Sequence, residues 1–116
     1  MNEFVLLYRN TAEARRRTID SPEMARQTLM KWRAWFEEIE RKGCLKSIGQ
    51  PLDESGKVVR GKFVTDGPYA ETKDVVGGYS LIEASDLEEA AKIAAGCPIF
   101  ENGGSVEVRP VMQMNG

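Results

Sequence analysis

The chain has 116 residues, of which 41% are hydrophobic and 29% charged, and its formal net charge is -2. This length and composition are typical of one domain with a single core, and we expect that domain to cover residues 1–116. The slightly acidic balance argues against a nucleic-acid surface, which needs a basic excess, and the longest apolar run is too short to span a membrane.

The first predicted element is a strand over residues 3–9, where apolar side chains alternate onto both faces. Such a strand should be central in its sheet. Residues 10–20 are polar and are expected to be irregular. Ser21, Pro22 and Glu23 then supply an N-cap, a proline in the first turn and an acidic first turn, so a helix should begin here.

One face of this helix carries apolar side chains at spacings of three and four residues, which predicts that it packs on the sheet. The stripe consists of Ala25, Leu29, Trp32, Phe36 and Ile39. Trp35, Thr28 and Met24 fall on the flank of the stripe, where a side chain could line a pocket or a subunit contact, and Trp35 could instead form a core edge. Gly43 is expected to end the helix.

A short strand over residues 44–49, a turn-rich loop and an extended hairpin interrupted at Gly61 should follow, and then a strand over residues 79–84. Asp86 has the spacing of a capping box with Glu89, so a second helix should begin there. The last strand, residues 105–111, puts Val106 and Val108 on one face and Glu107 and Arg109 on the other.

The predicted fold class is therefore α+β, a ferredoxin-like split βαβ sandwich with an added hairpin. Both helices should cover one face of the sheet. The opposite face is mixed, because the first strand is apolar there and the last strand is charged. We expect a second copy of the chain to cover this face and to leave a partly polar cavity between the sheets.

Histidine is absent from the sequence, which removes the commonest general base and most transition-metal sites. We therefore expect no metal and no cofactor. Cys44 and Cys97 lack metal-site spacing and are expected to be free thiols in a reducing compartment. The N-terminus does not resemble a signal peptide, so a cytoplasmic location is expected. The basic run at residues 15–17 is interpreted as a solvated segment.

The most distinctive segment is residues 64–73, VTDGPYAETK, followed by GGYSLI at residues 77–82. Asp66, Gly67 and Pro68 are turn formers whose backbone preferences predict a rigid connection. The two segments together resemble the signature of the DGPF branch of the YCII-related family, with Tyr69 where phenylalanine usually stands. The similarity extends over nearly the whole chain.

This resemblance implies a ferredoxin-like domain of the dimeric α/β-barrel type, which dimerises through its sheets and has a cleft near the signature loop. Some YCII relatives look like enzymes that use a histidine and aspartate pair, and other DGPF domains accompany sigma factors. The pair cannot be carried over to this chain, which has no histidine and retains only Asp66.

Three functional hypotheses follow. In the first, the protein is a non-catalytic homodimer that binds a small anionic or aromatic ligand. The candidate contacts are Arg9, Trp35, Asp66, Tyr69, Glu71, Tyr79 and Arg109. Two guanidinium groups would favour a carboxylate or phosphate. Alternatively, both arginines pair with Glu107 or Glu83 across the interface and bind nothing.

The second hypothesis is a lyase or isomerase that uses Asp66 or Glu71 as its base and Tyr69 as a proton donor, because burial can raise the pKa of a carboxyl group towards neutrality. The third is a regulatory module associated with a sigma factor.

Overall fold

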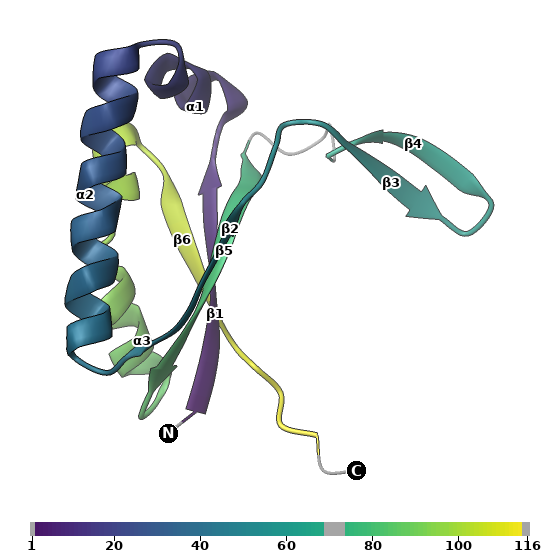
Figure 1. Cartoon of the computed structure of the whole chain (residues 1–116). Coiled ribbons are helices and arrows are strands. Elements are labelled where there is room, and N and C mark those ends of the chain that lie inside the picture. The colour runs from purple at the N-terminus through teal and green to yellow at the C-terminus, as the bar shows by residue number, and fades with distance from the viewer. Residues whose placement is uncertain (1, 69–73, 115–116) are drawn as a thin grey trace.

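The computed structural model describes residues 2–68 and 74–114 and contains a four-stranded sheet, a separate hairpin and a layer of helices (Figure 1). The strands are β1 (Asn2–Asn10), β2 (Leu45–Pro51), β3 (Gly56–Arg60), β4 (Phe63–Gly67), β5 (Val75–Ala84) and β6 (Ser105–Pro110). The helices are α1 (Ala12–Ile19), α2 (Pro22–Arg41), α3 (Leu87–Ala94) and the 3-10 helix η1 (Pro98–Asn102). Among the described residues, no helix is long and apolar enough to cross a membrane.

The sheet has the order β2-β5-β1-β6, and every neighbouring pair is antiparallel. Strand β5 therefore lies between β1 and β2, and β1 lies between β5 and β6. Each βαβ unit is thus split by a strand of the other unit, which is compatible with the predicted ferredoxin-like fold. The prediction of an α+β fold with antiparallel sheets is confirmed.

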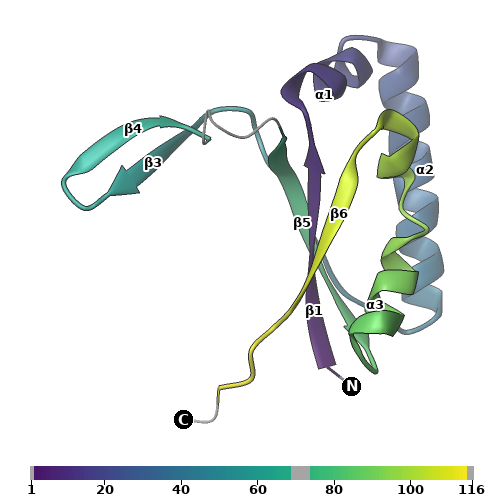
Figure 2. The same cartoon turned by 180° about the vertical axis from the view of Figure 1, so that it is seen from behind.

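Strand β1 is central, as its sequence predicts, and its two faces differ in burial. Phe4, Leu6 and Tyr8 are buried beneath the helices, whereas Val5 and Leu7 are half-buried on the other side. We call this second side, which faces away from α2 and α3, the open face. Figures 1 and 2 show the helices on one side of the sheet only.

Helix α2 begins where the sequence predicts, with the amide of Met24 donating to the Ser21 hydroxyl at 3.3 Å. Its apolar stripe, however, is rotated from the predicted one. Trp35 and Ile39 are 6% and 4% exposed, whereas Leu29 is 57% exposed. Thr28 is half-buried, so the inward face of α2 passes through Thr28 and Trp35, and the N-terminal half of that face borders a cavity.

Helix α3 contributes side chains to the same hydrophobic core as α2. Its N-cap is Asp86, whose carboxylate accepts from the amide of Glu89 at 2.8 Å, as the capping spacing predicts. Ala90 and Ala94 are buried and allow close approach to the sheet. Because α3 has only 8 residues, it covers one end of the sheet, opposite the end where α1 lies (Figure 1).

The prediction that residues 10–20 are irregular is wrong, because α1 occupies most of them. Its N-cap is Thr11, whose hydroxyl accepts from the amide of Ala14 at 3.1 Å. The 3-10 helix η1 was not expected either. Both short helices lie beside the end of the sheet that α3 does not cover, and both contribute to the walls of the cavity.

Strands β3 and β4 form a hairpin that projects from the body on the side opposite the helices (Figures 1 and 2). We call this hairpin the arm. Gly61 makes its turn with a φ of 62°, a conformation that favours glycine. The expected turn at Asp66 starts later than predicted, because Asp66 and Gly67 still belong to β4 and pair with β3.

Candidate functional site

A cavity of about 690 Å³ lies between the N-terminal half of α2, α1 and the end of the sheet where β1 finishes and β5 begins. We call it the α2 cavity. Its walls come from α1, α2, η1 and three strands, so it assembles segments that are distant in the sequence. A volume of this size accommodates a small organic molecule.

Most of the wall is apolar. The apolar side chains are Ile19, Met24, Ala25, Leu29, Trp32, Phe36, Ile48, Pro51, Val75, Pro98 and Ile99. The polar side chains are Asn10, Arg15, Thr18, Gln27, Thr28, Lys31, Gln50, Glu101 and Asn102. An apolar wall with a limited number of polar groups is typical of sites that bind small molecules.

Three aromatic rings in the wall contact one another. The rings of Tyr8 and Trp32 are perpendicular with centroids 4.7 Å apart, and Trp32 and Phe36 are 5.8 Å apart. Trp35 packs behind them, 6.2 Å from Tyr8 and 5.9 Å from Trp32. Trp32 thus contacts Tyr8 edge-to-face and Phe36 in a tilted arrangement, and such contacts stabilise the orientation of each ring, so this part of the wall is preformed.

The hydroxyl of Tyr8 takes part in hydrogen bonds that join three strands of the sheet beside the cavity. It donates to the Ser80 hydroxyl at 2.8 Å, and Ser80 donates to the carbonyl of Ile48 at 2.7 Å. These bonds link β1, β5 and β2. Burial raises the pKa of Tyr8 well above its usual range, although the hydrogen bond with Ser80 opposes the shift. The phenol is therefore neutral at physiological pH and acts as a hydrogen-bond donor.

Asn102 fixes α1 to the rest of the fold. Its side-chain amide donates to the carbonyl of Ala14 at 3.0 Å and to the hydroxyl of Thr18 at 2.8 Å. Its backbone carbonyl accepts from the side chain of Asn10 at 3.2 Å. The end of β1, α1 and η1 are thus held together at the cavity, which positions the side chains that α1 contributes.

Arg15 is the basic residue that α1 places in the wall. One of its terminal nitrogens donates to the carbonyl of Leu52, and the guanidinium lies against Gly77. A Cβ at Gly77 would be 3.4 Å from Cζ of Arg15, and one at Gly78 would be 3.1 Å from the carbonyl oxygen of Gln50. The two glycines therefore allow the side chain of Arg15 and strand β2 to approach β5 closely.

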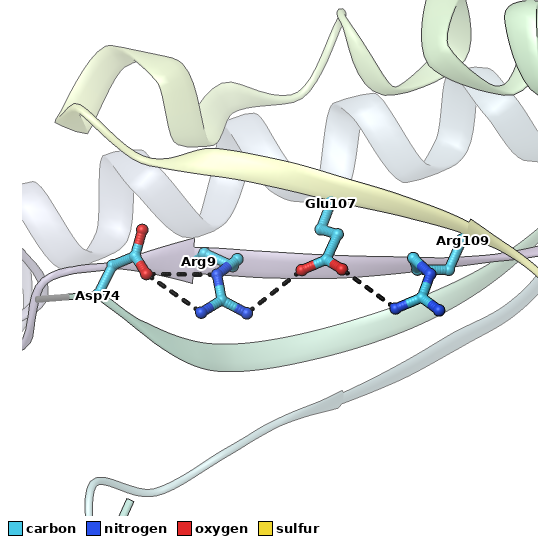
Figure 3. A network of polar contacts seen from close by, with 4 residues as sticks. All are labelled: Arg9, Asp74, Glu107 and Arg109. Atoms are coloured by element: carbon cyan, nitrogen blue, oxygen red, sulfur yellow. Dashed lines mark hydrogen bonds and ion pairs between the residues drawn. The ribbon is translucent and has the colours of Figure 1, made fainter. Parts of the chain in front are cut away.

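Arg9 and Arg109 do not reach the α2 cavity. They lie in a row on the open face, where Glu107 pairs with both at 3.3 Å and Asp74 pairs with Arg9 at 3.2 Å (Figure 3). Strands β1 and β6 pair as expected, but the register sets Arg9 opposite Ser105 and Arg109 opposite Val5, so the two arginines lie on either side of Glu107 and are not adjacent. Their contacts with Glu107 are made within one chain.

The other predicted site residues are dispersed. Trp35 is buried in the core and lies outside the lining of the α2 cavity, whereas Tyr79 borders it on β5. Asp66 lies on the arm with its side chain 90% exposed and paired with Lys57. Tyr69 and Glu71 lie outside the described residues. The described residues therefore do not bring the predicted contacts together in one site.

Thr28 and Met24, which the sequence puts on the flank of the stripe, line the cavity, and the lining residues that the sequence did not reveal are chiefly Arg15 and Leu29. Arg15 belongs to the run interpreted as solvated, and Leu29 was assigned to the core. The sequence contains one signal for the position of Arg15. Thr11 followed by Glu13 in the next turn is typical of a helix start, and a helix beginning there includes Arg15.

Other reactive groups are few in the described part of the chain. Cys44 and Cys97 are free, as expected. Burial raises the pKa of the Cys97 thiol to about 12, so it is an unreactive core residue. Within residues 2–68 and 74–114 no group of acidic or cysteine side chains is arranged to hold a metal ion.

The fold and the cavity define a class: an α+β protein compatible with the ferredoxin-like fold, with a ligand-sized cavity between its helix layer and one end of its sheet. A family model described as the YCII-related domain matches residues 3–115, so the chain belongs to the YCII-related family. No curated protein matches the sequence.

Proposed function

We propose that this protein is a homodimeric small-molecule-binding protein of the DGPF branch of its family, and that the ligand occupies the α2 cavity. The observation that carries the proposal is the cavity itself, whose volume of about 690 Å³ lies within the range of ligand sites. The signature segment leads directly into its wall, since Val75, Gly77 and Gly78 follow residues 69–73.

The composition of the wall supports binding over catalysis. The one carboxylate that the described residues contribute, Glu101, pairs with Lys31 at 3.1 Å and is exposed. The phenol of Tyr8 has its pKa raised further above the physiological range by burial, and its proton is directed at Ser80. These groups suit hydrogen bonding and packing against a ligand, whereas acid–base catalysis needs a positioned group that titrates near the working pH.

The proposal is tested by thermal-shift measurements with a panel of small aromatic and carboxylate compounds, because a ligand that binds the folded state raises the melting temperature. Compounds that raise it should lose their effect in Thr28→Trp, which places an indole in the cavity. Ala34→Trp is the matched control, because Ala34 is on the same helix but exposed to solvent. A shift that persists in Thr28→Trp, or a broad panel with no shift, contradicts the proposal.

The homodimer is proposed from two uncovered apolar surfaces. The open face carries half-buried Val5 and Leu7, and the arm exposes Phe63 (75%), Val59 (66%) and Val64 (59%). An isolated two-stranded hairpin is at best marginally stable in water, so the arm needs a packing partner. Both surfaces are on the same side of the molecule, and a twofold axis would let each arm cover the open face of the other copy.

Sedimentation velocity tests the dimer. Phe63→Glu should shift the protein towards the monomer at micromolar concentration, because it places a charge in the proposed interface. Phe100→Glu is the control, since Phe100 is also exposed but lies on η1 among the helices. Circular dichroism should show that both variants are folded. A wild-type monomer, or equal behaviour of the two variants, contradicts this interface.

A further inference from the structure

We propose that Arg15 makes the α2 cavity selective for anions, so that its ligand is a small aromatic compound that carries one carboxylate or similarly charged group. This inference rests on the proposed function, since it assigns a ligand class to the same cavity. It differs from the expectation that Arg9 and Arg109 bind the anion, because both lie on the open face and pair with carboxylates there.

The charge balance of the wall points to Arg15. The described residues contribute two cationic side chains to the cavity, Arg15 and Lys31, and Lys31 is paired with Glu101 at 3.1 Å. The partner of the Arg15 guanidinium is a carbonyl, that of Leu52, and no carboxylate of the described residues is within ion-pair distance of it. A guanidinium has five donors in a planar fork, so most of its hydrogen-bonding capacity is available to an anion.

The position of Arg15 is fixed before any ligand binds. Helix α1 is held by the two hydrogen bonds from Asn102, and the guanidinium itself is held by the carbonyl of Leu52 and by packing on Gly77. An anion that meets a preordered guanidinium gains a charge-assisted hydrogen bond with little additional ordering of the protein.

The rest of the wall selects the body of the ligand. The rings of Tyr8, Trp32 and Phe36 present faces and edges, and Leu29 and Ile48 add aliphatic surface. A planar aromatic group can pack edge-to-face in such a wall, in the manner of the Tyr8 and Trp32 rings themselves. A compound with an aromatic body and one anionic group can contact both the aromatic part of the wall and Arg15.

An alternative role for Arg15 is structural, in which it only ties the segment after β2 to α1 through Leu52. The two roles differ in what happens when the charge is removed. A structural clamp affects all ligands alike through the fold, whereas an anion-binding group affects charged ligands and leaves neutral ones unchanged.

The test uses two fluorescent probes that share one aromatic framework, 1-anilinonaphthalene-8-sulfonate and its uncharged counterpart N-phenyl-1-naphthylamine. Both should bind the wild-type protein, and Thr28→Trp should abolish both signals. Arg15→Gln should weaken the charged probe by about tenfold or more and leave the neutral probe within about twofold. Arg17→Gln is the control, because Arg17 is on the same helix but exposed, and it should change neither.

A second variant separates charge from the hydrogen bond to Leu52. Arg15→Lys keeps the charge and should retain most of the preference for the charged probe. Equal weakening of both probes by Arg15→Gln, or no weakening of the charged one, overturns the anion assignment while ligand binding in the cavity stands. Failure of both probes to bind, or binding that Thr28→Trp does not affect, overturns the proposed function as well.

Discussion

The hydrogen bonds from Tyr8 to Ser80 and from Ser80 to Ile48 predict that the effect of Tyr8→Phe on the free energy of unfolding depends on whether Ser80 is present. Ser80 is fully buried, and Tyr8 lies between the core and the cavity. Tyr8→Phe removes one donor and leaves the Ser80 hydroxyl able to donate to Ile48. Ser80→Ala removes both the acceptor of the Tyr8 hydroxyl and the donor to the carbonyl of Ile48, and it leaves a buried Tyr8 hydroxyl without its partner.

The magnitudes follow from this asymmetry. Tyr8→Phe should lower the free energy of unfolding by about 1 kcal/mol, the net value of one hydrogen bond. Ser80→Ala should lower it by about 2 kcal/mol, because an unsatisfied buried hydroxyl adds its desolvation cost. In the Ser80→Ala background, Tyr8→Phe removes that unsatisfied hydroxyl, so it should be neutral or stabilising.

The assay is a double-mutant cycle by urea denaturation, at one protein concentration because dimerisation would make stability concentration-dependent. The coupling between the two positions should be at least about 1 kcal/mol. If Tyr8→Phe costs the same in both backgrounds, the hydroxyl is satisfied by water from the cavity and the inferred role of Ser80 is wrong.

Three further predictions concern the core, the thiol and α1. Ile39→Ala should lower the free energy of unfolding by about 2–5 kcal/mol, and Leu29→Ala should lower it by less than about 1 kcal/mol, because Leu29 lies on the cavity. Both values are measured by urea denaturation. Similar losses for the two variants would contradict the packing of α2. Burial raises the pKa of Cys97 to about 12, so iodoacetamide at pH 8 should modify it only in denaturant, and rapid native labelling would refute its burial. Because the unfolded thiol loses its proton first, stability should fall with pH between the ordinary value of 9.0 and about 12, and Cys97→Ala should reduce that fall. Asn102→Ala should lower stability by about 2 kcal/mol and speed hydrogen exchange in α1, and unchanged exchange there would show that other contacts hold the helix.

The elements that could be predicted from the sequence are those with complete local signals. Ser21 and Pro22 mark the start of α2, Asp86 and Glu89 mark the start of α3, and the alternation around Leu6 marks a central strand. Each of these signals acts over a few neighbouring residues, so neither the rest of the chain nor a partner is needed to interpret it.

Helix α1 could not be predicted with the same certainty because local preferences do not stabilise it. An isolated helix of 8 residues is unstable in water, so α1 depends on tertiary contacts. Those contacts include packing against α2 and the two hydrogen bonds from Asn102, which is more than 80 residues away in the sequence. The sequence alone therefore does not distinguish Arg15 from the two arginines that follow it, and its position in the cavity is not apparent.

The stripe of α2 was misjudged for a related reason. A run of apolar residues at helical spacing shows roughly which face of a helix is turned inward, but it does not fix the exact rotation of the helix on the sheet. Thr28 and Trp35 lie on the inward face, so Leu29 and Ile39 have opposite environments although they belong to one predicted stripe.

The distribution of charge then separates two kinds of surface. On the open face, Arg9 and Arg109 are balanced by Asp74 and Glu107 in one row (Figure 3), and covering paired charges with a second copy costs less than covering unpaired arginines would. In the α2 cavity, Arg15 has a carbonyl as its partner and keeps a net positive charge. The arginines on the open face, each paired with Glu107, are thus suited to an interface, and the one that tertiary contacts bring to the cavity is suited to an anion.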